Sequence, residues 1–283
     1  MSLVQTLSDF SVRVVQVELL RLVGYKTHQQ PDEKLRALMA EAVAEAEVLA
    51  RPRALVGLFE KKDVPEGTHL STFFAPASDS GRGALTARTG VSGADVAGAP
   101  AGATAVTGVT GAGTTEAAGL PGRPGGSAPE ITGGTRRPKP SIPPALEVAL
   151  SVCTIGAPLE ERVSEYSSAG ELTRSLILDA AGSVLTEAVC DYANEKICGR
   201  AVGRSLYTTR RVSPGYGRWK IEEQKVIFQL LPADSIGVTL TKSYMMIPRK
   251  SVSFAVRLTA ERPTGQFGSP CATCGREGCE FRR

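Results

Sequence analysis

Apolar residues recur with two different periodicities near the start of the chain, and each periodicity predicts one kind of secondary structure. Residues 12–25 (VRVVQVELLRLVGY) begin with alternation and then change to helical spacing, which predicts a short strand that runs into a helix ending near Gly24. Residues 31–50 carry an apolar stripe at helical spacing, and Pro31 suits the first turn, so a longer helix is predicted there. Residues 54–60 (ALVGLFE) are typical of a strand.

Patterns typical of strands and of helices also occur in the second half of the chain. Residues 147–156 (EVALSVCTIG) are mostly apolar, which predicts a buried strand that stops at its final glycine. Residues 158–170 predict a short helix, and Ser168 with Glu171 matches a capping box for a long helix that follows. The apolar residues expected on the buried side of that helix are Leu172, Leu176, Leu185, Val189, Tyr192 and Ile197. Its Gly182 is expected either to bend the helix or to allow close packing.

The last third of the chain predicts one more helix and two strands. Residues 220–231 (KIEEQKVIFQLL) have helical spacing, with Ile221, Ile227, Phe228 and Leu231 as candidate core contacts. Residues 236–248 and 251–260 alternate with period two and are separated by a short Pro-Arg-Lys segment, which predicts a hairpin between them. The pattern as a whole predicts an α+β fold: a mixed, twisted sheet with antiparallel strands, packed by long helices.

The segment between the two patterned parts of the chain has a different amino-acid composition from both of them. Residues 77–143 consist mainly of Gly, Ala, Thr, Ser and Pro with few large apolar side chains, so they cannot bury enough surface to offset the entropy lost on ordering. We expect a disordered insert on one domain made of residues 1–76 and 144–262. A linker between two domains is the less favoured alternative, because the first part looks too small for a good core. Residues 263–283 form a cysteine-rich tail.

Charge and hydropathy exclude some classes of function. The chain has 33 basic and 29 acidic residues, and no basic block with interleaved aromatics, so direct nucleic-acid binding is not expected. No apolar run approaches bilayer length and no secretory leader is evident, which predicts a soluble, cytoplasmic protein without a membrane partner. Cys153, Cys190 and Cys198 lie in apolar or helical contexts, where reduced, buried thiols are expected.

Residues 210–224 (RRVSPGYGRWKIEEQ) combine two arginines, a tight turn and two aromatics. Pro214-Gly215 favours a type II turn, and Ser213 before the proline is driven toward an extended conformation. The turn could bring Arg211 and Tyr216 to one side, where a guanidinium fork and an aromatic face suit a small zwitterionic ligand. The alternative is a plain surface turn, with its aromatics packed beneath it and its arginines solvated, and spacing alone favours that alternative.

Other candidate catalytic groups are sparse. Asp179, Glu187 and Asp191 lie along the predicted long helix, where such carboxylates more often form a solvated face than an acid–base pair. We find no Ser-His-Asp or Cys-His arrangement and no Gly-rich loop between a strand and a helix.

Three blocks of sequence resemble the activation domain of cobalamin-dependent methionine synthase. They are residues 176–197, the 211–231 stretch, and the segment from residue 237 to 256, and residues 17–25 (VELLRLVGY) resemble the short, free-standing members. The motif positions that match are Arg211, Pro214, Gly215, Tyr216, Leu240, Thr241, Ser243, Met245, Pro248, Ser251, Val252 and Ser253.

The resemblance implies a fold, a ligand and a partner. The fold would be the C-shaped α+β arrangement of that domain. The domain binds S-adenosylmethionine and supports reductive methylation of inactive cob(II)alamin, with an electron from a flavodoxin-like donor. By position, Arg211 would pair with the methionine carboxylate, Ser213 would offer backbone hydrogen bonds to the adenosyl end, Tyr216 would line the site, and Glu187 would face the corrin partner. No cobalamin-binding Asp-x-His-x-x-Gly segment is present, so the cobalamin would come from a separate methyltransferase chain and this chain would not be self-sufficient as an enzyme.

The tail leaves further alternatives open. Cys271, Cys274 and Cys279 are close enough in sequence to reach one zinc ion or iron–sulfur cluster, although a fourth ligand is missing locally. A reduced, exposed tail is the plainer interpretation. The tail could instead act as an iron–sulfur electron relay. A non-catalytic partner-binding protein is the other alternative, since the family's N-terminal acidic residue in an Asp-Trp context has no evident counterpart.

Overall fold

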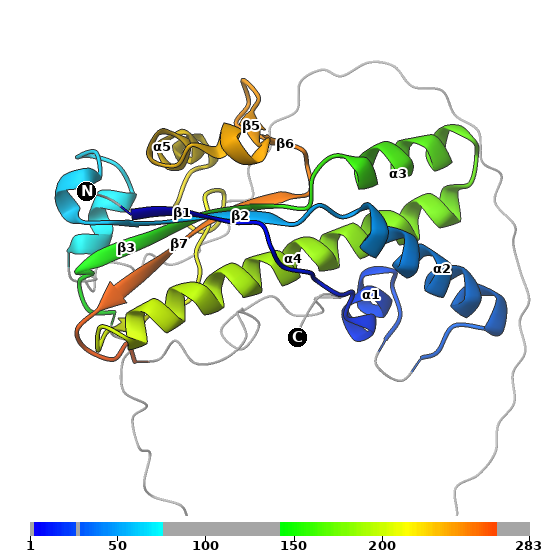
Figure 1. Cartoon of the computed structure of the whole chain (residues 1–283), viewed down its shortest axis with the longest axis horizontal. Helices are drawn as coiled ribbons and strands as arrows, with labels where there is room; N and C mark the ends of the chain where they lie inside the picture. The colour runs from blue at the N-terminus through cyan, green and yellow to red at the C-terminus, as the bar shows by residue number, and fades with distance from the viewer. Residues whose placement is uncertain (1–2, 27–28, 76–141, 265–283) are drawn as a thin grey trace, which may run out of the picture. The chain divides into compact units, whose positions relative to one another are not determined.

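A five-stranded antiparallel sheet forms the centre of the structure, a computed structural model that describes residues 3–26, 29–75 and 142–264. The strand order is β1-β2-β3-β7-β4, and helices cover both faces (Figure 1). The strands are β1 (Leu3–Leu7), β2 (Arg53–Phe59), β3 (Glu147–Thr154), β4 (Tyr207–Thr208) and β7 (Ser251–Thr259). The predicted α+β class with antiparallel strands is confirmed.

The three central strands are buried on both faces. In β3 every residue after Glu147 is buried, and β7 is buried at seven of its nine positions. A strand covered on both faces reads as a continuous apolar run rather than an alternating one. This explains why the sequence of β3 predicts a strand so clearly.

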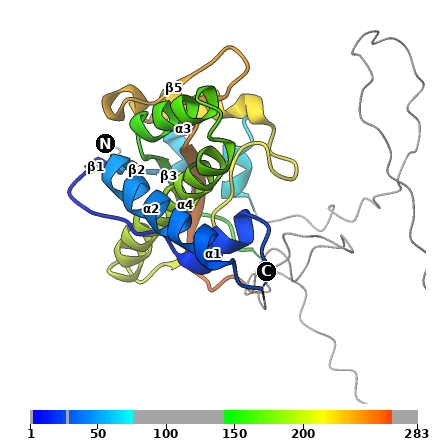
Figure 2. The same cartoon turned by 90° about the vertical axis from the view of Figure 1, so that its right-hand side faces the viewer.

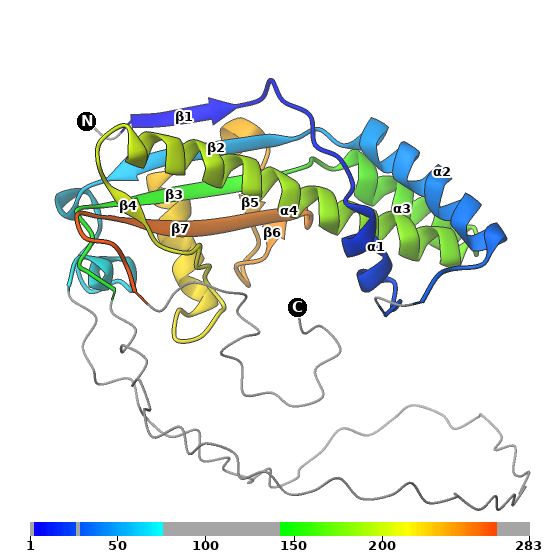
Figure 3. The same cartoon turned by 90° about the horizontal axis from the view of Figure 1, so that it is seen from below.

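A group of four α-helices lies with one face of the sheet: the longest contacts the strands, and the other three pack against it. They are α1 (Gln16–Leu22), α2 (Glu33–Leu49), α3 (Pro158–Ser168) and α4 (Leu172–Val202). Helix α4 runs along the sheet (Figure 3), and α2 and α3 pack against its N-terminal half (Figure 2). Its Leu185 and Val189 meet Phe254 of β7 in a continuous core.

The other face carries shorter elements. They are η1 (Lys61–Asp63), η2 (Leu70–Phe74), η3 (Ile221–Glu223), α5 (Gln224–Leu230), η4 (Ala233–Ile236) and a small hairpin of β5 (Thr239–Leu240) with β6 (Met246–Ile247). Phe73, Trp219, Ile227 and Leu231 form the core beneath them. The predicted helix at 220–231 is therefore a 3-10 turn followed by a short α-helix.

The predicted hairpin between residues 236–248 and 251–260 is wrong. β7 pairs with β3 and β4, while β5 pairs with β6 inside the first segment. The reversal occurs at Tyr244, which has a φ of 62°, and the Thr241 N–H donates to the Met245 carbonyl across the turn. Periodicity locates a strand but does not identify its partner.

The N-terminal prediction also needs correction. The strand lies at Leu3–Leu7, and residues 11–15 form no regular element before α1 begins at Gln16. Pro31 is not in the first turn of α2, because Asp32 is the N-cap and accepts a hydrogen bond from the Leu35 N–H at 2.8 Å.

Two details predicted for α4 are also wrong. Ser168 is the last residue of α3 rather than the cap of α4, because Gly170 with a φ of 81° ends α3 and Glu171 is the N-cap of α4 without a side-chain cap bond. Leu172 and Leu176 are 66% and 60% exposed, so they are not core residues. Both belong to the start of α4, the end of that helix that extends past the sheet (Figure 3).

Gly182 supports close packing, the second of its two predicted roles. A Cβ atom at this position would lie 2.6 Å from Cδ2 of Leu159, a fully buried residue of α3. Such a distance is shorter than any real Cβ contact, so glycine allows α3 and α4 to approach each other.

Several expectations fall on residues that the structure does not describe. The predicted insert (77–143) and the cysteine-rich tail (263–283) lie almost entirely outside the described ranges, so the division of the chain into these parts stays a prediction. Among the described helices, none has both the length and the apolar composition that crossing a bilayer requires.

Candidate ligand-binding site

A β-bulge sets the position of Arg211 at the edge of the sheet. Thr208 pairs with Leu258, whereas Val212 forms the next bridge with Ala255. The chain therefore advances four residues against three on β7, and the extra residue is a bulge. Bulges change the side toward which a side chain projects, and here the Arg211 guanidinium lies 5.4 Å from the ring centroid of Phe254, on the face covered by α4.

Arg211 is held between the sheet and two carboxylates of α4. Its Nη2 lies 2.9 Å from Asp191 Oδ1 and 3.2 Å from Glu187 Oε2, and its side chain is 27% exposed. Its Nη1 is buried and has no hydrogen-bond partner. The structure thus brings together Arg211 and Glu187, which the sequence nominated separately, and the solvated arginine of the plain surface turn is not what is observed.

The charges of this group are unbalanced. One guanidinium faces two carboxylates, which leaves one net negative charge, and Glu187 and Asp191 remain 58% and 67% exposed. These carboxylates do face solvent, as the sequence predicts, but they also form ion pairs. Asp179, which lies earlier on the same helix, pairs with Lys250 Nζ at 2.9 Å. Asp191 was named from the sequence only as part of a solvated face, and its pairing with Arg211 was not predicted, although its i, i+4 spacing from Glu187 was the available signal.

The turn that follows Arg211 has the predicted form. Gly215 has a φ of 89°, and its N–H donates to the Trp219 carbonyl at 2.7 Å. Trp219 is 3% exposed and packs beneath the turn, whereas Tyr216 is 77% exposed. The Tyr216 ring is therefore exposed to solvent, and its role in lining the site stays a prediction.

The extended segment before the turn is only partly available to a ligand. Both backbone groups of Val212 bond to Ala255, at 3.0 Å and 2.8 Å. Because neighbouring residues of an extended chain direct their backbone groups to opposite sides, those of Arg211 and Ser213 lie on the outer edge. The Ser213 carbonyl accepts a hydrogen bond from the Tyr216 N–H at 3.3 Å, so the N–H of the half-buried Ser213 is its backbone group that remains accessible.

Two buried thiols lie behind the site. A hydrogen bond with Cys153 and burial raise the pKa of Cys190 well above its usual value. Both side chains are buried and free of disulfides. Cys198 is half-buried and also free, so the expectation of reduced thiols agrees with the structure for all three. The raised pKa keeps the Cys190 thiol protonated at neutral pH, so it is a poor nucleophile.

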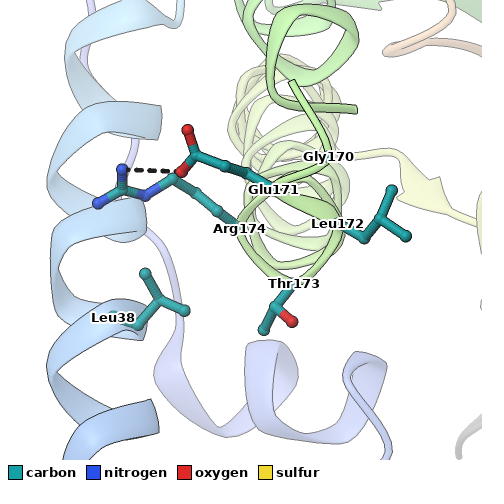
Figure 4. A pocket seen from close by; sticks show the side chains of 6 residues that line it. All are labelled: Leu38, Gly170, Glu171, Leu172, Thr173 and Arg174. Carbon is teal, nitrogen blue, oxygen red and sulfur yellow. Dashed lines mark hydrogen bonds and ion pairs between the residues drawn. The ribbon is translucent and has the colours of Figure 1, made fainter. Parts of the chain in front are cut away.

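Other candidate sites are weaker. An open hollow of about 370 Å³ lies between α2 and the start of α4 (Figure 4), lined by Leu38, Gly170, Glu171, Leu172, Thr173 and Arg174. Its one guanidinium is already paired with Glu171 and with Glu41, at 3.3 Å and 2.7 Å. Within the described ranges, no cluster of His, Cys, Asp and Glu could hold a metal ion. The predicted ligands Cys271, Cys274 and Cys279 lie outside those ranges.

A family model and a solved structure are similar to the part of the chain that contains the site. The family model described as the vitamin B12 dependent methionine synthase activation domain matches residues 147–263, a span from the start of β3 to just past the end of β7. A solved structure, described as the MetH reactivation domain bound to AdoHcy, matches with a TM-score of 0.52 and 16% identity, over 90% of this chain and 78% of that one. At that identity the match shows a shared fold. Residues 147–263, which contain α4, the bulge and the Arg211 turn, therefore belong to the activation domain family of vitamin B12 dependent methionine synthase.

Proposed function

We propose that this chain binds S-adenosylmethionine at Arg211 and supports reductive methylation of cobalamin carried by a separate chain, a methionine synthase or a related corrinoid methyltransferase. The observation that carries the proposal is the buried Nη1 of Arg211, which lacks a partner. A buried donor without an acceptor costs about 1–3 kcal/mol, and a ligand carboxylate would satisfy it. The family membership and the AdoHcy bound to the structural relative support the same ligand.

The charges fit this ligand. S-adenosylmethionine carries a carboxylate, an ammonium and a sulfonium, so its net charge is positive by one, whereas the Arg211, Glu187 and Asp191 group is negative by one. The ligand carboxylate would bind Arg211 while its cationic groups lie toward the carboxylates of α4. The main chain of Ser213 would hydrogen-bond the adenosyl end, and the exposed ring of Tyr216 is available to stack on it.

The chemistry requires positioning more than proton transfer. S-adenosylmethionine supplies a methyl group on a positive sulfur, and the reduced corrinoid accepts that methyl group once an electron has been delivered. Holding the reactants in line can supply several kcal/mol of the barrier. The residues of this chain would therefore bind and orient the sulfonium, the partner would supply the cobalamin, and a flavodoxin-like protein would supply the electron in the cytoplasm.

The reaction itself can be followed by the visible absorption spectrum of the cobalamin. A cobalamin-carrying methyltransferase in the cob(II)alamin state is mixed with this chain, S-adenosylmethionine and a flavodoxin-like reductant, and the visible spectrum is recorded. Our proposal predicts conversion to the methylcobalamin spectrum only when all components are present. Conversion at the same rate without this chain would contradict it.

One structural observation favours a second candidate, a non-catalytic partner-binding protein. Arg211 already has two carboxylate partners within its own chain, so a ligand must compete with them. If this candidate is correct, a cobalamin protein captured by the chain would bind equally well with and without S-adenosylmethionine, and no heat of ligand binding would be measured.

The carboxylates of α4 should distinguish the ligand from its demethylated product. S-adenosylhomocysteine lacks the sulfonium charge, so removing the negative charges in Glu187→Gln and Asp191→Asn should weaken the preference for S-adenosylmethionine by roughly 1.5- to 5-fold each, since both groups are exposed. The ratio of the two dissociation constants, measured by calorimetry, cancels any change in Arg211 that affects both ligands. Asp179→Asn on the same helix is the matched control, and an unchanged ratio in the double variant would refute this role.

A further inference from the structure

A second cationic group lies on the opposite face of the sheet from Arg211. The Arg257 guanidinium of β7 lies 4.3 Å from the ring centroid of Phe73. The rings of Phe73, Trp219 and His69 contact one another, with centroids 5.4 to 5.6 Å apart. Phe73 belongs to η2 and His69 directly precedes it, Trp219 follows the turn at Pro214, and Arg257 is on β7, so the fold alone brings them together.

Two hydrogen-bond donors in this cluster have no acceptor. They are Nε1 of Trp219, a residue only 3% exposed, and the buried Nη1 of Arg257. Both lie on residues that contact Phe73. Buried donors are nearly always satisfied in native proteins, so two of them around one ring indicate an acceptor that the protein does not itself supply.

The charge of Arg257 is also unbalanced. None of the ion pairs among the described residues includes it, and burial alone lowers its pKa. The nearby Glu223 accepts a 2.7 Å hydrogen bond from the His69 backbone N–H. Burial is the main cause that lowers the pKa of His69, which therefore contributes no positive charge at neutral pH. The cluster thus holds one uncompensated cation among aromatic rings.

The cluster is reachable from solvent. From Ser253 to Thr259, Arg257 is the one residue that is not fully buried, and His69 is half-buried as well. The exposed parts of Arg257 and His69 therefore connect the cluster to solvent, whereas Phe73 and Trp219 are buried.

We propose that Arg257 and Trp219 form a binding site for a small aliphatic monocarboxylate. A planar carboxylate matches the guanidinium fork and can also accept from the indole N–H. One negative charge balances the single cation, whereas a dianion would leave an excess charge beside aromatic rings and Glu223. The site is separate from Arg211 and does not depend on the function proposed above.

The single tryptophan of the chain makes the site observable. In a ¹⁵N correlation spectrum, the protein has one indole N–H signal, which belongs to Trp219. Titration of the full chain with acetate and propionate, at ionic strength held constant with sodium chloride, should shift this signal in a saturable way. Absence of a saturable shift in the wild type overturns the proposal, as does a larger affinity for inorganic phosphate.

Variants assign the effect to Arg257. Arg257→Met keeps an apolar stem on Phe73 and should abolish the saturable shift, and Arg257→Lys, which keeps the charge but lacks the fork, should weaken it at least several-fold. Arg174→Met is the matched control, because Arg174 also lies over an aromatic ring, Tyr166, and should leave the shift unchanged. A shift of equal size in Arg257→Met would contradict the assignment.

Discussion

Replacing Arg211 with alanine is expected to weaken the binding of S-adenosylmethionine by about 10- to 150-fold, because a charged hydrogen bond contributes about 1.5–3 kcal/mol. The variant removes the cation that faces the ligand carboxylate and leaves Glu187 and Asp191 without their partner. Arg211→Lys keeps the charge but not the fork, so its loss should be intermediate. Isothermal titration calorimetry with S-adenosylmethionine measures all three proteins directly.

Arg174→Ala is a closely matched control for this experiment. Arg174 is 30% exposed, pairs with two carboxylates and lies 5.2 Å from an aromatic ring centroid, which are nearly the surroundings of Arg211. It lies in the first turn of α4, away from Glu187 and Asp191, so its loss should leave ligand affinity within about twofold, as surface substitutions usually do. An Arg211→Ala variant that binds as tightly as the wild type would remove Arg211 from the site.

Introducing valine at Gly182 is expected to destabilise the protein by about 1–3 kcal/mol, the usual penalty for overpacking a core. The new Cβ would meet Leu159 at 2.6 Å and the Lys250 side chain at 3.4 Å, so α3 and α4 must separate or Leu159 must leave its rotamer. Urea denaturation, followed by the fluorescence of the single tryptophan, measures the change in the free energy of unfolding.

The double variant Gly182→Val with Leu159→Ala tests the cause. Leu159→Ala alone creates a cavity and should also destabilise the protein, but together the two changes should be less harmful than their sum, because the valine occupies the space that leucine vacates. Strict additivity would show that the helix contact at Gly182 is not the reason for the loss.

The sequence predicted the elements of this fold better than their pairing. β3 and α4 are evident because long apolar patterns specify them, and Gly156 and Gly203 lie just beyond their ends. The pairing of β7 with β3 was not predictable, because more than ninety residues separate the two strands and periodicity carries no information about a distant partner. The short β1 was missed since its five residues alternate too briefly to be distinguished.

The candidate site was predicted only in part. The Arg211 turn was identified from its motif, and the positive φ of Gly215 follows from the Pro-Gly pair. The bulge could not be predicted, because it depends on the register between Thr208 and Val212 on one strand and β7 on the other. For the same reason the Arg257 cluster was invisible, since its members are scattered from residue 69 to residue 257.

The measurement that tests the central claim most directly is a crystal structure of this chain grown with S-adenosylmethionine. Our account predicts the ligand at the edge of the sheet beside α4, with its carboxylate on the Arg211 guanidinium and its positive sulfur toward Glu187 and Asp191. A structure in which Arg211 keeps both of its carboxylate partners, with the ligand bound elsewhere or not bound at all, would contradict it.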